Sequence, residues 1–188
     1  MLTFTEEEFE KYQNRIAGER REAQLRRSYQ GGVSRAQGAQ FEQAIADACD
    51  LYREKGMADI EKTPEPMRPI KRLEGGRFVA IFEKQAQPDY KGILAGGQSV
   101  MFEAKSTATD RITQDRVTED QAERLSRCAE LGGMAFVLCG FASGQVYKLP
   151  WNIWRQMRGR FGVKYITEEA AAPYRCRLTA RGEPLFLE

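Results

Sequence analysis

Three side chains near the middle of the chain have the types and spacing needed for phosphodiester chemistry. Asp89 follows Pro88, and Glu103 and Lys105 follow Asp89 after fourteen and sixteen residues. Two neighbouring carboxylates repel each other unless a cation lies between them, and Mg²⁺ prefers such hard oxygen ligands. A bound metal would activate a water molecule, and the ammonium group of Lys105 would stabilise the extra negative charge on phosphorus. The pattern therefore predicts a metal-dependent hydrolase.

Two predicted strands position these groups. Asp89 to Leu94 and Gln98 to Lys105 have strand patterns, and Gly96-Gly97 provides a turn between them. Side chains alternate along a strand, so Glu103 and Lys105 share one face. Since a short turn favours antiparallel neighbours, we expect Asp89 to lie beside Glu103. Glu-x-Lys alone is more typical of an ion pair within a sheet, and the upstream Pro-Asp shifts the interpretation to a nuclease.

The composition excludes several other kinds of site. The chain has no histidine, which excludes Ser-His-Asp catalysis, Cys-His catalysis and histidine-ligated zinc. Its cysteines form no C-x-x-C pair and fit neither a disulfide framework nor a zinc site. Acidic residues stand where a signal peptide would be basic, and no apolar stretch approaches the roughly 18 residues that span a bilayer. We therefore expect a cytoplasmic protein.

The remaining elements follow from periodicity and turn residues. Residues 34 to 55 have helical spacing, with Ser34 as N-cap, and Thr118 begins a capping box for a helix over Glu119 to Leu131. Pro64 to Gly76 is too rich in proline and glycine for continuous regular structure and indicates a protruding connection. Further strands are expected over Met57–Thr63, Arg77–Lys84, Met134–Cys139 and Gln145–Leu149, and a helix with both tryptophans after Pro150.

This order predicts an α/β fold with a mixed central sheet flanked by helices. The arrangement is restriction-endonuclease-like, and a stalk of about residues 64–76 protrudes between the first two strands. Residues 1–33 are expected to form a basic arm, partly disordered or helical, and residues 34–188 a single nuclease domain. Charge supports the arm, because Lys11 to Arg35 has seven basic and two acidic residues, whereas the whole chain has a net charge of only +2. The alternative for this stretch is an ordinary solvated helix face.

The Pro-Asp…Glu-x-Lys pattern resembles the PD-(D/E)xK nuclease superfamily. Several segments read together resemble, more narrowly, the RecU family of Holliday-junction resolvases, over most of the chain from Ser34 to Leu149. The phenylalanine, glutamate, alanine and lysine at 102–105 are the most specific part. The segments are Gly38-x-x-Phe41-Glu42, Glu61-Lys62-Thr63-Pro64-x-Pro66, Pro88-Asp89-Tyr90-x-Gly92, Phe102-Glu103-Ala104-Lys105-x-Thr107, Gln121 and Val146-Tyr147.

The resemblance implies a set of site residues. Asp89, Glu103 and Gln121 would bind Mg²⁺, or Mn²⁺ in its place, and Lys105 would stabilise the transition state. The family has a metal-binding threonine two residues before the aspartate, where this chain has Gln87. Glutamine oxygen can still bind a cation, but metal affinity or preference would differ. For Gln121 the competing interpretation is a capping-box glutamine.

A further acid is expected near the metal in such nucleases, and Glu42 is the candidate. Its alternative is a solvent-facing helix glutamate. The resemblance also implies a homodimer that nicks opposing strands of a four-way junction, which has matching two-fold symmetry. A recombinase is a further candidate partner. The predicted DNA contacts on the arm and stalk are Arg20, Arg21, Arg26, Arg27, Arg35, Arg68, Lys71 and Arg72.

Two other functions stay open at this point. One is a PD-(D/E)xK nuclease of another DNA specificity, such as a restriction-type or repair enzyme. The other is a junction-binding or recombinase-modulating protein without turnover, in which Glu103 and Lys105 form only an ion pair.

Overall fold

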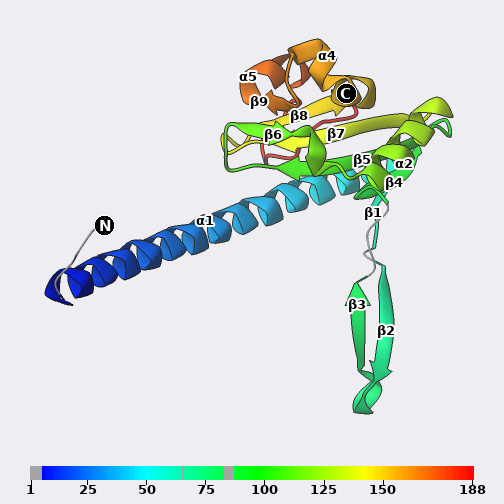
Figure 1. The fold of residues 1–188 in the computed structure, drawn as a ribbon. Helices are drawn as coiled ribbons and strands as arrows, with labels where there is room; N and C mark the ends of the chain where they lie inside the picture. Colours follow the sequence, from blue (N-terminus) through cyan, green and yellow to red (C-terminus); the bar gives the residue numbers. More distant parts are fainter. Residues whose placement is uncertain (1–5, 65, 83–86) are drawn as a thin grey trace.

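A computed structural model describes residues 6–64, 66–82 and 87–188, and its centre is a five-stranded mixed sheet (Figure 1). The strand order is β1-β4-β5-β7-β8, with β5 and β7 parallel and the other neighbours antiparallel. The predicted α/β fold with a mixed sheet is confirmed. The strands are β1 (Ala58–Lys62), β4 (Tyr90–Leu94), β5 (Ser99–Ser106), β7 (Met134–Gly140) and β8 (Val146–Pro150).

Helices cover both faces of this sheet and create two apolar clusters. On one face, Ile45 and Tyr52 of α1 (Glu6–Glu54) pack with Phe102 of β5. On the other face, α2 (Glu119–Glu130) and α3 (Trp151–Arg155) contribute Leu125 and Trp154. The strand β7 lies between both layers, and its residues from 136 to 140 are buried, as predicted for a central strand.

An aromatic stack packs β4 and β5 into the core. Phe102 stacks on Tyr90 of β4 and on Phe136 of β7, with 4.7 Å between ring centroids in each pair. Near the end of the chain, Phe186 packs against Phe102 and against Tyr52 of α1. Burial of several large rings around Phe102 anchors β5 in the core.

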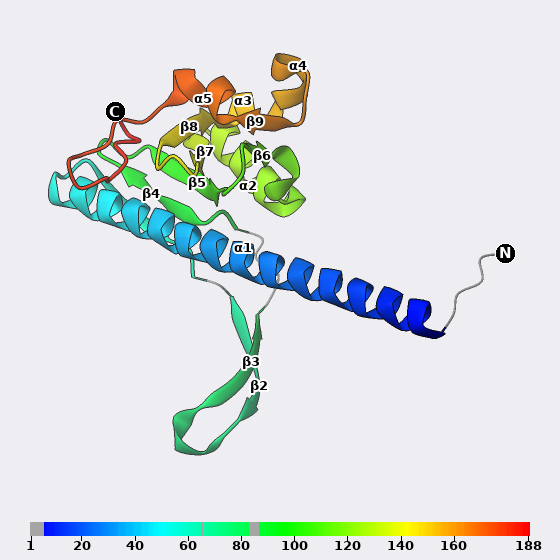
Figure 2. The ribbon, with the colours of Figure 1, turned by 90° about the vertical axis from the view of Figure 1, so that its left-hand side faces the viewer.

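The first helix is longer than the sequence predicts. It is continuous from Glu6 to Glu54, so Ser34 is not an N-cap. Gly31 and Gly32 each weaken a helix by up to about 1 kcal/mol, but propagation from an already packed segment tolerates them. The N-terminal half of α1 projects away from the sheet (Figures 1 and 2). The division of the chain into an arm and one nuclease domain at this point stays a prediction.

A two-stranded hairpin protrudes between β1 and β4, where a stalk is predicted (Figures 1 and 2). Its strands are β2 (Met67–Arg72) and β3 (Phe78–Phe82), joined through a short 3-10 helix, η1 (Glu74–Gly76). The strand predicted over Arg77–Lys84 is present as β3, but it belongs to the hairpin and not to the central sheet; residues 83 and 84 lie outside the described part. The described part, β3, pairs with β2, so the stalk extends beyond Gly76.

The segment between β5 and α2 contains regular structure. Here β6 (Arg111–Thr113) pairs with β9 (Tyr165–Thr167), and a 3-10 turn, η2 (Gln114–Arg116), leads to α2. These elements pack beside α3 and enclose a pocket described below. The remaining short helices are α4 (Met157–Phe161), α5 (Glu168–Ala171) and η3 (Ala172–Tyr174).

Gly92 allows β1 and β4 to approach closely. A Cβ atom at this position would lie 2.1 Å from the backbone oxygen of Asp59, which no side chain could accept. The pairing of β1 with β4 therefore requires glycine here, and this pairing holds the start of β4 next to the candidate site.

Candidate active site

The register of β4 and β5 places Asp89 opposite Glu103. Tyr90 pairs with Phe102, so the residue before β4 lies beside the residue after Phe102. The backbone N–H of Asp89 donates to Glu103 Oε2 over 3.1 Å, and Ala104 N–H donates to Asp89 Oδ2 over 3.1 Å. The two carboxylates therefore converge on the same side of the strand pair, which is the arrangement that a shared cation requires.

Glu103 is the centre of this cluster. It is fully buried, and its Oε1 accepts hydrogen bonds from Lys105 Nζ at 2.5 Å and from Gln121 Nε2 at 2.8 Å. Burial, together with the charge of Asp89, raises the pKa of Glu103 to about 7, while Lys105 acts in the opposite direction. A buried carboxylate with a raised pKa gains most from a bound cation, because the cation favours its charged form.

Lys105 connects the buried cluster to the surface. Its side chain is 16% exposed, and it projects from the same face of β5 as Glu103. The ammonium group has three donors and uses one of them on Glu103. It can therefore also bind a phosphate oxygen or orient a water molecule at the edge of the cluster.

Gln121 forms the predicted capping box and also contacts the carboxylate cluster. Its Oε1 accepts from the backbone N–H of Thr118 at 3.0 Å, and Thr118 Oγ1 accepts from Gln121 N–H at 3.4 Å, which is the predicted capping box. The same amide donates through Nε2 to Glu103. To bind a cation through Oε1, the amide would have to rotate by half a turn and leave Thr118.

Two other predicted site residues lie outside this hydrogen-bonded cluster. Gln87 is exposed, and its Oε1 accepts from Lys91 Nζ at 3.2 Å. Glu42 on α1 is exposed and forms a 2.7 Å ion pair with Lys62 at the end of β1. An exposed ion pair of this kind contributes little to stability. Gln87 stands two residues before Asp89, and Lys62, the partner of Glu42, pairs with Tyr90 of β4. The described contacts of Gln87 and Glu42 are both with lysines.

Thr63 is a site neighbour that residue types alone did not reveal. Its backbone N–H donates to the backbone oxygen of Asp89 over 2.7 Å, and the residue is only 5% exposed. Its buried Oγ1 has no hydrogen-bond partner among the described residues. A buried hydroxyl without a partner costs roughly 1–3 kcal/mol, so this atom favours a water or ligand beside Asp89. The only sequence signal was its place in the segment from Glu61 to Pro66.

The donor set suits a hard divalent cation. Within the described ranges, no group of three or more His, Cys, Asp or Glu side chains is placed to hold a metal ion, and the cluster offers two carboxylates. Mg²⁺ commonly uses one or two carboxylates and retains several waters. Asp89 and Glu103 therefore fit Mg²⁺ or Mn²⁺.

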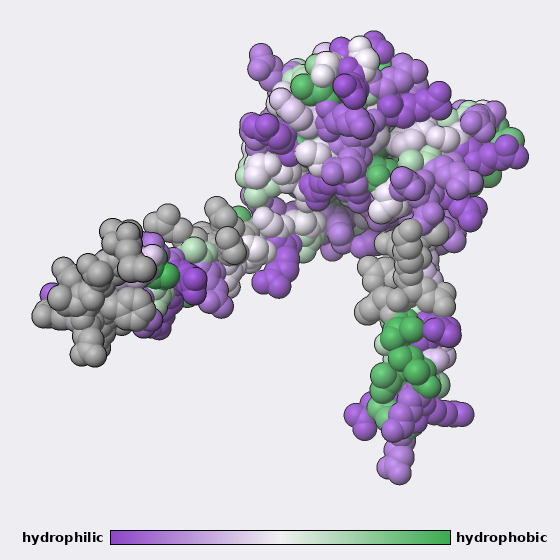
Figure 3. Space-filling view, in the orientation of Figure 1, coloured by the Kyte–Doolittle hydropathy of each residue, from purple (hydrophilic) through white to green (hydrophobic). Residues whose placement is uncertain are grey.

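The predicted DNA contacts lie on two projecting elements. Arg20, Arg21 and Arg35 are exposed on α1, and Arg68, Lys71 and Arg72 are exposed on the hairpin. The side chains of Arg26 and Arg27 lie outside the described part of the structure. Figure 3 shows that the hairpin also carries apolar side chains on its surface. These are Met67, Ile70, Leu73, Phe78, Val79 and Ile81, all at least 40% exposed.

A membrane-spanning helix was not found among the residues that the structure describes, where every helix is too short or too polar.

Comparison with known proteins decides the family. The family model described as recombination protein U, RecU, matches residues 36–184. The chain belongs to the RecU family. The match begins within α1 and includes the hairpin, β4, β5 and α2. Every member of the carboxylate cluster therefore lies inside it.

Curated relatives agree with this RecU assignment. One from Streptococcus gordonii, named Holliday junction resolvase RecU, is 32% identical over 120 residues, which are 60% of each chain. Another of the same name, from Staphylococcus saprophyticus, is 28% identical over 151 residues, covering 74% of this chain and 72% of the relative. The chain thus spans less than two thirds of the length of the first of these relatives.

A solved structure gives a weaker likeness. It is that of Archaeoglobus fulgidus Hjc, a Holliday junction resolvase from an archaeal hyperthermophile. The TM-score is 0.42 at 17% identity, covering 72% of this chain and 92% of that one. Membership of the RecU family rests on the sequence matches and not on this structure.

Proposed function

We propose that this RecU-family chain is a divalent-metal-dependent endonuclease that resolves four-way DNA junctions. The observation that carries the proposal is the convergence of Asp89, Glu103 and Lys105 on one edge of the β4–β5 pair. The names of the relatives support the junction as substrate. An ion pair with a purely structural role would not require a second carboxylate in contact with it.

Asp89 and Glu103 would hold the cation, with Mg²⁺ as the first candidate and Mn²⁺ as a substitute. When bound, the cation supplies an activated water and neutralises phosphate oxygens. Gln121 keeps the Glu103 carboxylate in position through its 2.8 Å hydrogen bond. Lys105 would bind a phosphate oxygen where negative charge develops in the transition state.

Gln87 and Glu42 are proposed to act at the edge of this site. Gln87 stands two residues before Asp89, and its amide oxygen would approach the cation after leaving Lys91. Glu42 forms an ion pair with Lys62, and Lys62 of β1 pairs with Tyr90 of β4. We propose that it tunes the site electrostatically as an additional acid, and that these roles are weaker than those of Asp89 and Glu103.

The DNA would be held by the exposed cations of α1 and of the hairpin. A homodimer would present two such sites to the two equivalent strands of a junction, and a recombinase would be an additional partner. Phosphate contacts by arginine and lysine make affinity fall with salt by roughly 0.9 log units per contact for each tenfold increase. The predicted set is Arg20, Arg21, Arg26, Arg27, Arg35, Arg68, Lys71 and Arg72.

Cleavage of synthetic substrates tests this proposal. A labelled four-way junction, a linear duplex of the same sequence and a single strand are incubated with the chain in Mg²⁺, Mn²⁺ or a chelator. Paired nicks in the junction with either metal, and none with the chelator, are expected. Cutting of the linear duplex at one sequence would instead favour a nuclease of another specificity. Tight junction binding without cleavage in any metal would indicate a non-catalytic binding protein.

A further inference from the structure

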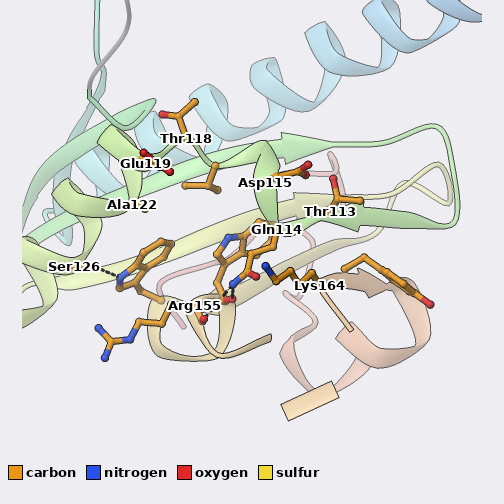
Figure 4. Close-up of a pocket in the computed structure, with 13 residues that line it drawn as sticks. Thr113, Gln114, Asp115, Thr118, Glu119, Ala122, Ser126, Arg155 and Lys164 are labelled. Atoms are coloured by element: carbon orange, nitrogen blue, oxygen red, sulfur yellow. Dashed lines mark hydrogen bonds between the residues drawn. The ribbon is translucent and has the colours of Figure 1, made fainter. Parts of the chain in front are cut away.

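A second site lies beside the catalytic cluster, on the other side of α2. Figure 4 shows a pocket between the first half of α2, the η2 turn, α3 and the start of β9. Its volume is about 950 Å³, and Trp151, Trp154 and Tyr165 are among its walls. None of the residues assigned to metal binding or to phosphate chemistry lines this pocket. The proposed reaction therefore does not use it.

Helical spacing explains how one helix serves both sites. Thr118, Ala122 and Ser126 are four residues apart and line the pocket, whereas Gln121 and Leu125 point to the sheet. The first turn of α2 therefore has Glu103 on one side and the pocket on the other. A helix with its side chains is about 10 Å across. A DNA strand whose phosphate contacts Lys105 would bring a neighbouring nucleotide towards the pocket.

Hydrogen bonds hold most of the pocket wall in place, but one buried N–H group of the wall has no acceptor in the described part of the chain. Trp151 Nε1 donates to Ser126 Oγ over 2.9 Å, and Gln114 Nε2 donates to the backbone oxygens of Trp154 and Arg155. The Nε1 group of Trp154 is buried and has no acceptor among the described residues. Buried indole N–H groups usually have a partner, and this one belongs to a residue that lines the pocket.

Charges of both signs surround the opening. Arg155 and Lys164 are exposed on one part of the rim, and Asp115 and Glu119 are exposed on another (Figure 4). A site for a bare phosphate or for an anionic surface would not carry two carboxylates. A nucleotide has both features to match, because its phosphate pairs with arginine or lysine and its base offers amino groups to carboxylates.

We propose that this pocket binds one nucleobase of the DNA strand that passes the catalytic cluster. The inference rests on the proposed nuclease function, and it adds a contact that selects or positions the strand near the cut. A base taken out of its stack would rest against the aromatic walls, as single-stranded nucleic acids do on aromatic side chains. Arg155 and Lys164 would hold the phosphate that follows it.

Intrinsic fluorescence can test this directly, because Trp151 and Trp154 are the only two tryptophans of the chain and both line the pocket. The full chain is titrated with a synthetic four-way junction in a chelator, so that no cleavage occurs. We expect the tryptophan emission to change on binding. We also expect a single abasic position near the branch point to remove most of that change, while abasic positions elsewhere leave it intact.

A pocket-filling substitution provides the second measurement. Ala122→Leu adds bulk at the pocket wall without changing helix propensity much. Ala129→Leu, on the exposed side of the same helix, is the matched control. We expect Ala122→Leu to weaken junction binding about tenfold, the order expected for one stacked base, and Ala129→Leu to leave it unchanged.

The outcomes separate the pocket from the nuclease proposal. If the junction is bound and cleaved but no abasic position alters the emission and Ala122→Leu binds normally, the nucleobase site is wrong and the nuclease stands. If free mononucleotides change the emission at the same concentrations as the junction, the pocket is a small-molecule site and the inference also fails. If the wild-type chain neither binds nor cleaves a junction, both proposals fall together.

Discussion

Two antiparallel strand pairs of this molecule lie in opposite environments. In the β4–β5 pair, Phe102 is fully buried under α1 and stacks between two other rings. In the β2–β3 hairpin, Phe78 is 56% exposed, and every described side chain of β2 faces solvent. Residues of α1 cover the β4–β5 pair, whereas the side chains of β2 face solvent.

Under the proposed function, the buried β4–β5 pair carries the chemistry and the exposed hairpin contacts the DNA. The carboxylates need a fixed geometry, and the packed pair β4–β5 holds them with hydrogen bonds from the backbone and from α2. An isolated two-stranded hairpin is marginally stable at best, so β2–β3 gains most from contact with another molecule. Its exposed cations and apolar side chains suit such a contact.

The largest expected effect is on catalysis by the packed pair. Asp89→Asn and Lys105→Ala should each lower the rate of junction cleavage by at least about 100-fold, because each removes a group that acts on the transition state. Junction affinity in a chelator should change less than about threefold. Cleavage rates and gel-shift titrations measure the two quantities.

Glu130→Gln is a suitable control for these changes, because Glu130 is an exposed carboxylate at the end of α2, away from the cluster. It should cleave as the wild type does. Unchanged cleavage by Lys105→Ala would leave the Glu103–Lys105 contact as a structural ion pair only.

The two phenylalanines provide the next comparison. Phe102→Ala should lower the free energy of unfolding by about 3–5 kcal/mol, since it opens a cavity in a fully packed core. Phe78→Ala should change it by less than about 1 kcal/mol, because its ring is largely in solvent already. Urea unfolding followed by circular dichroism measures both. Similar losses for the two variants would show that the hairpin is packed against something in solution.

The raised pKa of Glu103 makes stability depend on pH. In the folded chain without metal this pKa is about 7, above its usual 4.5, so between these values the folded state binds more protons than the unfolded state. Stability should therefore fall as pH rises from about 4.5 through about 7, by about 3 kcal/mol in total. Urea unfolding in a chelator at pH 5 and pH 8 measures this.

Glu103→Gln is the control, since it cannot ionise and should lose this part of the pH dependence. Addition of Mg²⁺ at pH 8 should stabilise the wild type and not the variant. Identical pH profiles for both proteins would contradict the assigned burial and charge environment.

The smallest effect on stability is expected at the hairpin cations. Replacing Arg68, Lys71 and Arg72 together with glutamine should change the free energy of unfolding by less than about 0.5 kcal/mol. The junction affinity should fall, and its dependence on salt should become shallower by up to about 0.9 log units per lost contact. Lys55→Gln, at an exposed position beyond α1, is the control. An unchanged salt dependence would remove the hairpin from the DNA interface.

Local signals explain which parts of the fold the sequence could reveal. The capping box at Thr118, the turn at Gly96-Gly97 and the alternation along β5 act over a few residues, and each appears in the structure as predicted. The turn and the alternation along β5 were enough to predict that Asp89 lies beside Glu103.

Features that depend on distant contacts could not be read in this way. The segment from Arg77 to Lys84 has the pattern of a strand, but that pattern does not reveal that its described part pairs with β2 outside the central sheet. The continuation of α1 through Gly31-Gly32 depends on packing at its other end. The partners of Glu42 and Gln87, and the pocket behind α2, arise from residues far apart in the chain.

Direct measurement of metal binding tests the central claim. Titration of the chain with Mn²⁺ by calorimetry should show one site per chain, and Asp89→Asn and Glu103→Gln should each weaken it at least about tenfold, whereas Glu130→Gln should not. Equal Mn²⁺ affinity in the wild type and in the two cluster variants would contradict the account, because the carboxylates that converge between β4 and β5 would then hold no cation.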